Sequence, residues 1–234
     1  KEARIEKLQN FDLYLEKLQK DMSSAEKTVD ALCGCISKIR KEAAKDLSGQ
    51  ITVHLAELNF LDVRFEIQLE QMDSYSANGY DETEYMIAVN VGESLKPLAK
   101  VASGGELSRV MLALKTVLAD KDEVESIIFD EIDTGISGRT AQKVSEKMSL
   151  IGKNRQVICI THLPQIASMA DAHFLIEKTV QGQVTTTGIR RLKVAEEVEE
   201  LARMLGGVEI TDKVLENAQE MKKQANDLKA KNCQ

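Results

Sequence analysis

Residues 100–119, KVASGGELSRVMLALKTVLA, decide the fold of this chain together with residues 126–137, SIIFDEIDTGIS, and residues 156–165, QVICITHLPQ. The first stretch predicts a helix, because Ser103 and Glu106 have the spacing of a capping box and apolar residues follow at helical intervals. Each of the other two begins with a short apolar run, which is typical of a buried strand, and ends in polar side chains. Strands that alternate with helices predict an α/β sheet, which binds ligands at the carboxyl ends of its strands.

The predicted helix has an N-terminus that is suited to a phosphate. Gly104 and Gly105 directly follow Ser103, and because glycine has no side chain, the first amides of the helix remain uncovered. Free amides, the helix dipole and a serine hydroxyl together favour an anion. The same residues also fit a helix that is merely well capped, and this segment alone leaves both interpretations open.

Two neighbouring acids, Asp130 and Glu131, end the apolar run of residues 126–129. They are costly to bury without a cation, and phosphoryl transfer uses such a pair, with the aspartate for Mg²⁺ and the glutamate for a water. An ordinary exit from strand to loop is the alternative. His162, which follows the apolar run of residues 156–161, is likewise either a structural or a catalytic histidine at a strand end.

A coiled coil is predicted at the start of the chain. Apolar residues alternate in steps of three and four over about five heptads, namely Leu8, Phe11, Leu15, Leu18, Met22, Ala25, Val29, Leu32, Ile36, Ile39 and Ala43. A helix of about 40 residues reaches about 60 Å, too far to be covered by the rest of the chain, so it needs a partner helix. That partner is either another chain or a segment upstream of Lys1. We expect the upstream segment, because a start without methionine indicates a piece of a longer protein.

The pattern predicts an arm over residues 1–58 and a lobe over residues 59–234. Alternating polar and apolar residues predict two antiparallel strands at 63–70 and 85–91, separated by a loop at Asn78-Gly79.

Farther along, three apolar runs at 126–130, 156–161 and 173–178 predict a βαβ sheet. Gln181-Gly182 predicts a hairpin into a further strand. Two helices are predicted to close the chain, the first ending at Gly206-Gly207.

The composition excludes several classes of protein. The 234 residues contain no run of about 18 apolar residues, and the first residues lack the apolar centre of a signal peptide, so we expect a cytoplasmic protein with no membrane segment. The four cysteines suit neither a disulfide framework nor a zinc site with paired ligands. The net charge of −7 gives no independent support to a nucleic-acid partner.

Taken in order, these motifs resemble the C-terminal half of an ABC-type ATPase head, with ASGGE as signature motif, SIIFDE as Walker B, TGIS as D-loop and THLPQ as the histidine switch. The heptad arm is similar to that of the SMC-like branch. From Phe60 to Lys178 the amino-acid sequence closely resembles that of the bacterial members that act in DNA double-strand-break repair. The arm resembles theirs only in being a coiled-coil helix. The resemblance implies an α/β fold: the C-terminal lobe of an ABC/SMC-type P-loop ATPase head with an N-terminal coiled-coil arm helix.

In this family two heads enclose ATP and Mg²⁺ between them. The resemblance implies that Asp130 holds Mg²⁺ through water, that Glu131 polarises the attacking water, and that His162 senses the γ-phosphate. It further implies that a signature motif contacts the nucleotide of the facing head and that a D-loop crosses the interface; these are Ser103, Gly104, Gly105 and Glu106, and Thr134, Gly135, Ile136 and Ser137.

Two positions remain open within the resemblance. Many family members end the D-loop in aspartate where this chain has Ser137, which leaves a carboxylate role there in doubt. Arg109 either supports the phosphate or pairs with an acid, and we predict the pairing.

The sequence contains no G-x-x-x-x-G-K-[ST] phosphate-binding loop. The resemblance places that loop in an N-terminal half of the same protein and implies that this chain alone is inactive. The implied partners are this N-terminal half, a second head in a homodimer, and DNA at its double-stranded ends. The implied location is the nucleoid in the cytoplasm of a bacterium. The alternative is a non-catalytic coiled-coil scaffold or docking module with an ATPase-like lobe; the long heptad arm argues against a transporter cassette.

Overall fold

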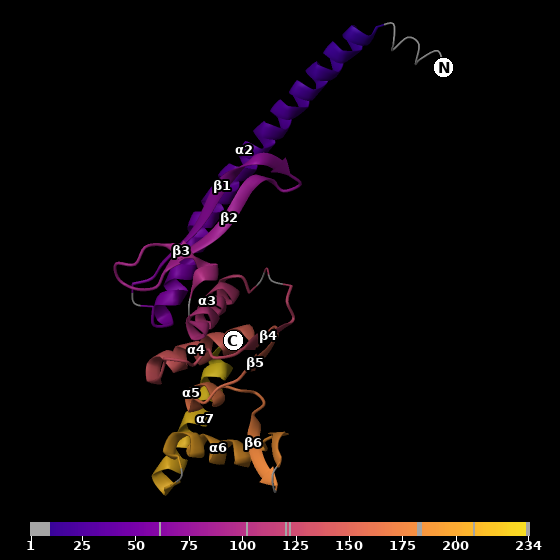
Figure 1. The fold of residues 1–234 in the computed structure, drawn as a ribbon. Helices are drawn as coiled ribbons and strands as arrows, with labels where there is room; N and C mark the ends of the chain where they lie inside the picture. Colours follow the sequence, from indigo (N-terminus) through magenta and orange to yellow (C-terminus); the bar gives the residue numbers. More distant parts are fainter. Residues whose placement is uncertain are drawn as a thin grey trace.

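The computed structural model describes residues 10–60, 62–101, 103–119, 121, 123–181, 184–207 and 209–232. Figure 1 shows one long helix that projects from a lobe of shorter elements. In chain order these are α2 (Phe11–Glu57), β1 (Arg64–Ser76), β2 (Gly79–Ala88), β3 (Lys96–Pro97), the 3₁₀ turn η1 (Leu98–Lys100), α3 (Gly104–Val117), β4 (Ser126–Phe129), α4 (Gly138–Ile151), β5 (Gln156–Cys159), α5 (Pro164–Ala167), β6 (Phe174–Gln181), β7 (Val184–Arg191), α6 (Val194–Gly206) and α7 (Asp212–Asn232).

The long helix α2 is exposed along its first half and buried at its base. Residues 10–32 are exposed throughout, so the predicted heptad seam faces solvent there. Near the other end, the side chains of Ile51 and Leu55 have no exposed surface. The helix continues through Gly49 to Glu57, and Asn59 then adopts a left-handed φ of 71°. The lobe therefore holds the base of α2 through apolar burial.

The hairpin of β1 and β2 lies along α2 (Figure 1). Its strands pair in antiparallel register from Arg64 opposite Ala88 onward, as the sequence predicts, and β3 adds a short edge. Arg40 of α2 donates to Oδ2 of Asp81 of β2 at 2.9 Å, which fixes the hairpin against the helix.

A hydrophobic core joins the base of α2 to the hairpin, α3, β4 and α4. Its side chains without exposed surface include Leu58, Ile87, Val110, Leu112, Ile132 and Val144. Full burial of one such side chain contributes about 1.5–3 kcal/mol, so this cluster determines how the arm meets the lobe.

β4 and β5 form a parallel pair with α4 in the crossover, as the sequence predicts. The prediction that residues 173–178 extend this sheet is wrong for the described residues. β6 pairs in antiparallel fashion with β7 alone, from Phe174 opposite Arg191 to Gln181 opposite Val184. The adjacent strand satisfies the backbone of β6 locally and needs no crossover connection.

One face of the parallel pair is apolar and exposed. Ile128, Ile158 and Ile160 are 67%, 45% and 51% exposed, and Ile128 lies in register with Ile158. Parallel strands normally have both faces covered, so this face is suited to contact another element.

The C-terminal helices α6 and α7 pack on each other through Leu201, Ala202 and Ala218. Gly207 adopts a φ of 70° just after α6, which confirms the predicted stop. Within the part of the chain that the structure describes, no helix combines the length and the apolar character needed to cross a membrane.

Candidate active site

The N-terminus of α3 is tied to the residues that follow β4. Ser103 caps the helix, because its Oγ accepts a hydrogen bond from the amide of Glu106 at 3.5 Å. The serine part of the predicted capping box is thereby confirmed. Ser108 donates from its Oγ to the carbonyl oxygen of Asp130 at 2.9 Å, so the first turns of α3 are fixed beside the acidic strand end.

The two glycines of α3 allow Glu131 and its turn to approach the helix closely. A Cβ on Gly105 would lie 2.9 Å from the carbonyl oxygen of Glu131 and 3.0 Å from Cβ of Thr134. A Cβ on Gly104 would lie 2.5 Å from Oε2 of Glu131. The Glu131 carboxylate is therefore close to the positive end of the α3 dipole, where negative charge is favoured.

Asp130 and Glu131 are both exposed at the end of β4. The sequence argument that burial makes this pair costly therefore does not apply to the chain in this structure. Glu131 adopts a left-handed φ of 56°, a backbone conformation that persists only where its surroundings hold it. The amide of Glu131 donates to Oδ1 of Asp130 at 2.9 Å, and its carbonyl accepts from the amide of Thr134 at 3.0 Å.

Residues 134–137 form a turn from β4 into α4. Gly135 adopts a left-handed φ of 75°, and the side chain of Ile136 is buried in the core. Thr134 and Ser137 are exposed, and Ser137 precedes α4 as its N-cap without a side-chain hydrogen bond. The turn thus presents polar residues beside the start of α3.

Among the residues that the structure describes, Arg109 forms no ion pair with an acid, so our prediction for this residue is wrong. Its guanidinium is buried and donates from Nη1 to the carbonyls of Thr134, at 2.8 Å, and Ile132, at 3.5 Å. It also lies over the ring of Phe60, 5.4 Å from the centroid. Burial lowers the pKa of Arg109. Arg109 therefore braces α3 against the turn, a role that only the tertiary contacts reveal.

Asp133 joins the turn to the end of β5; the sequence indicated only that this acid lies near the turn of residues 134–137. Its side chain is buried, and its Oδ2 accepts hydrogen bonds from Oγ1 of Thr161 at 2.6 Å and from the amide of His162 at 2.8 Å. The imidazole Nδ1 of His162 lies 3.0 Å from the same oxygen. The sequence feature that could have identified Asp133 is its place between the apolar Ile132 and the turn, at the edge where the parallel strands end.

The structure thus brings the four predicted groups of residues to one edge of the parallel pair. The start of α3 and the turn lie against Glu131, and Asp133 links that turn to His162. Burial, together with the charges of Asp133 and Asp130, raises the thiol pKa of Cys159, which precedes this edge on β5, to about 12. A pKa this high disfavours the thiolate form near neutral pH.

The donor set fits a magnesium ion that arrives with a nucleotide. Mg²⁺ keeps several waters and binds through one or two carboxylates plus phosphate oxygens, and Asp130 offers an exposed carboxylate. Among the described residues no group of three or more His, Cys, Asp or Glu side chains is placed to hold a metal ion by itself. Adjacent amides at the start of α3 fit the phosphates.

No family model matches the chain. Its sequence is 41% identical to the DNA repair protein RecN of Bacillus subtilis (strain 168) over 243 residues, which cover 97% of this chain and 42% of that protein. It is 40% identical to the DNA repair protein RecN of Halalkalibacterium halodurans over 232 residues, with 97% and 41% covered. The chain is RecN-like. It spans less than half the length of the RecN proteins that it matches.

Among solved structures, the chain is similar to the Smc head domain with a coiled coil and joint derived from Pyrococcus yayanosii. The TM-score is 0.50 at 16% identity, and the match covers 85% of this chain and 37% of that chain. At this identity the likeness concerns the fold alone. It confirms the predicted fold class: the RecN-like chain has the fold of a lobe of an SMC-type head and carries a long N-terminal helix.

Proposed function

We propose that this RecN-like chain is the C-terminal lobe of an SMC-like ATPase head, which hydrolyses ATP at a head-head interface and acts in the repair of DNA double-strand breaks. The observation that carries the proposal is the convergence of the α3 N-terminus, Glu131, the turn of residues 134–137 and His162 at one sheet edge. Ligands of α/β sheets bind at such an edge.

In this proposal the residues divide the work of phosphoryl transfer. Asp130 holds Mg²⁺ through water, and Glu131 orients and polarises the attacking water. His162 contacts the γ-phosphate from the end of β5. The amides at Ser103–Glu106 serve the nucleotide of a facing head, and the turn at Thr134–Ser137 crosses the interface between the heads.

Two exposed apolar surfaces support a P-loop half as partner. The face of Ile128, Ile158 and Ile160 is open on the parallel pair, and the heptad seam of α2 is exposed over residues 10–32. The matched RecN proteins are more than twice as long as the region that this chain covers, which leaves room for such a half. We propose that the half covers the sheet face and that its own arm helix packs on α2.

We propose DNA as a partner because the matched relatives are named DNA repair proteins. The net charge of −7 implies that a DNA-binding surface is local or lies elsewhere in the full-length protein. A gel mobility-shift assay of the full-length protein with linear duplex DNA tests whether it binds DNA. We expect binding that weakens as the salt concentration rises, and absence of binding at low salt contradicts the proposal.

Substitution Glu131→Gln in the full-length protein tests the catalytic part. We expect ATP binding to persist while turnover falls at least about 100-fold, because an amide cannot polarise the water. Fluorescent ATP titration and phosphate release measure the two steps. Glu125→Gln, at an exposed acid just before β4, is the matched control and is expected to leave turnover unchanged.

The same variant separates the ATPase from a non-catalytic scaffold. A Glu131→Gln head that binds but does not hydrolyse ATP should dimerise when ATP is added, as measured by light scattering during gel filtration. A scaffold would give the same mass with and without ATP, and equal hydrolysis by the wild type and the Glu131→Gln variant would refute the role of Glu131.

A further inference from the structure

We infer that Asp133 is the positioning residue for His162: its carboxylate holds the imidazole as the Nδ1–H tautomer and turns Nε2 outward to the site edge. The inference deepens the proposed function, on which it rests for the role of His162. It concerns a residue outside the signature, the acidic strand end and the turn of residues 134–137.

The first support is the convergence of donors on one oxygen. Oδ2 of Asp133 accepts from Oγ1 of Thr161 at 2.6 Å and from the amide of His162 at 2.8 Å, and it lies 3.0 Å from Nδ1 of His162. Thr161 Oγ1 in turn accepts from the amide of Leu163 at 3.0 Å. The same carboxylate oxygen thus accepts hydrogen bonds from Thr161 and from the backbone of His162, and it lies within ion-pair distance of the His162 ring.

The second support is the contrast in burial between the two side chains. The Asp133 side chain is 5% exposed and that of His162 is 73% exposed. A buried carboxylate is stable only when hydrogen bonds replace its lost water, so the donors on Oδ2 are required by the fold. The exposed ring, by contrast, would rotate freely without this contact. Asp133 therefore restricts a side chain that packing does not restrain.

The tautomer follows from the chemistry of the contact. A carboxylate oxygen only accepts hydrogen bonds, so the imidazole nitrogen that faces it must carry a proton. When His162 is neutral, its Nε2 is then bare and can accept a hydrogen bond from a water; when His162 is protonated, Nε2 can donate to a phosphate oxygen. In both states the same nitrogen faces the site, an arrangement used by other histidines that act beside an orienting carboxylate.

The position of Asp133 also couples two predicted elements of the site. Asp133 belongs to the segment between Glu131 and Thr134, whose carbonyls contact the α3 glycine and Arg109. Any movement of this turn therefore moves the oxygen that orients His162. The histidine is thereby linked to α3 through Asp133 and the turn, whose Thr134 carbonyl accepts from Arg109 of α3.

Nitrogen NMR of this chain tests the tautomer directly. The chain has three histidines, so ¹⁵N-histidine labelling gives three imidazoles, assigned through His54→Gln and His173→Gln variants. At a pH where the ¹⁵N shifts show a neutral ring, we expect His162 in the Nδ1–H form in the wild type. In Asp133→Asn we expect the Nε2–H form to become the major one.

Thr161→Val is the matched control. It removes one hydrogen bond from the same Oδ2 atom but leaves the carboxylate beside Nδ1, so the tautomer should stay as in the wild type. A wild-type ring in the Nε2–H form overturns the inference, and this result does not depend on whether Asp133→Asn folds. An unchanged tautomer in folded Asp133→Asn overturns it as well.

A second readout uses ATP hydrolysis by the full-length protein. We expect Asp133→Asn to lower kcat about 10- to 100-fold, with a much smaller change in KM, because the ring is misoriented while nucleotide contacts remain. A fall in ATP affinity at unchanged kcat would contradict a positioning role. If the wild-type protein hydrolyses no ATP, the proposed function fails, while the NMR result still decides the role of Asp133.

Discussion

Gly104 and Gly105 are neighbours at the start of α3, yet a side chain at each would meet a different kind of atom. At Gly104 the nearest atom is Oε2 at the flexible end of the Glu131 side chain, which can move aside. At Gly105 the nearest atoms are the carbonyl oxygen of Glu131 and Cβ of Thr134, which belong to a turn held by Arg109. Of the two glycines, only Gly105 therefore packs against the backbone of the turn.

We predict that Gly105→Ala destabilises this chain by about 1–3 kcal/mol, because the added methyl group forces the turn away from α3. Gly104→Ala is the matched control, and we expect it to change the free energy of unfolding by no more than about 0.5 kcal/mol. Urea unfolding of both variants, followed by circular dichroism, gives the comparison. Equal free energies of unfolding for the two variants would show that the turn yields without cost.

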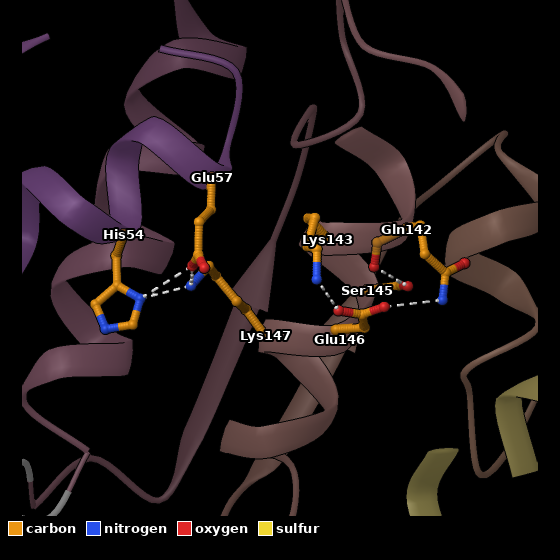
Figure 2. Close-up of polar contacts among 7 residues, drawn as sticks. All are labelled: His54, Glu57, Gln142, Lys143, Ser145, Glu146 and Lys147. Atoms are coloured by element: carbon orange, nitrogen blue, oxygen red, sulfur yellow. Dashed lines mark hydrogen bonds and ion pairs between the residues drawn. The ribbon is translucent and has the colours of Figure 1, made fainter. Parts of the chain in front are cut away.

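At the scale of elements, the base of α2 is joined to α4 by a polar cluster (Figure 2). Lys147 of α4 donates from Nζ to Oε2 of Glu57 and contacts Nδ1 of His54, both at 2.5 Å. The Lys147 side chain is only 7% exposed. On the same helix Lys143 pairs with Glu146 at 2.9 Å near the surface. Because α4 begins directly after the turn of residues 134–137, Lys147 connects the arm to the element that carries this turn.

We expect Lys147→Met to lower the free energy of unfolding by about 1 kcal/mol, because methionine keeps the apolar stem but loses the contacts to Glu57 and His54. The exposure of Glu57 limits the effect, since its carboxylate can regain water. Lys143→Met removes a more exposed pair within one helix and should cost less than about 0.5 kcal/mol. The midpoints of urea unfolding compare the stability of the two variants. A larger loss of stability for Lys143→Met than for Lys147→Met would contradict a special role of Lys147.

At the scale of the whole molecule, two histidines from distant regions make its stability depend on pH. Burial, and then the charge of Lys147, lowers the pKa of His54 at the base of the arm, although Glu57 acts in the opposite direction. Burial also lowers the pKa of His173 beside α6, where Glu200 and Glu197 raise it and Lys222 lowers it. The folded chain therefore takes up protons at these sites less readily than the unfolded chain does.

We predict that the free energy of unfolding falls as the pH is lowered through 6.5, the ordinary histidine value, toward the depressed folded values. Above pH 6.5 both states hold these rings neutral, and the effect vanishes. Urea midpoints at pH 7.5 and 5.5 measure the slope. The double variant His54→Gln, His173→Gln should show a smaller loss; a slope as steep as that of the wild type would assign the pH dependence to other groups.

Much of the fold was predictable because it follows from local patterns. Heptad spacing from Leu8 to Ala43 predicts a long helix, and the observed helix continues past this seam to Glu57. The Ser103 cap and the Gly207 stop bound helices as expected. Gln181-Gly182 predicts the hairpin in which β6 pairs with β7. The apolar run of β6 did not reveal that this hairpin lies outside the parallel sheet, because such a run fits either arrangement.

The sequence by itself determined the arm helix, the βαβ unit and the order of the site motifs, since these depend on periodicity and on neighbours a few residues apart. The tertiary structure alone decided that Asp133 holds His162, that Arg109 binds carbonyls, and that Lys147 meets His54 and Glu57. Asp133 and His162 are 29 residues apart, Arg109 and Thr134 are 25 apart, and Lys147 and His54 are 93 apart. Contacts over such separations are set by how the buried faces of the elements pack together, a property that no local pattern encodes.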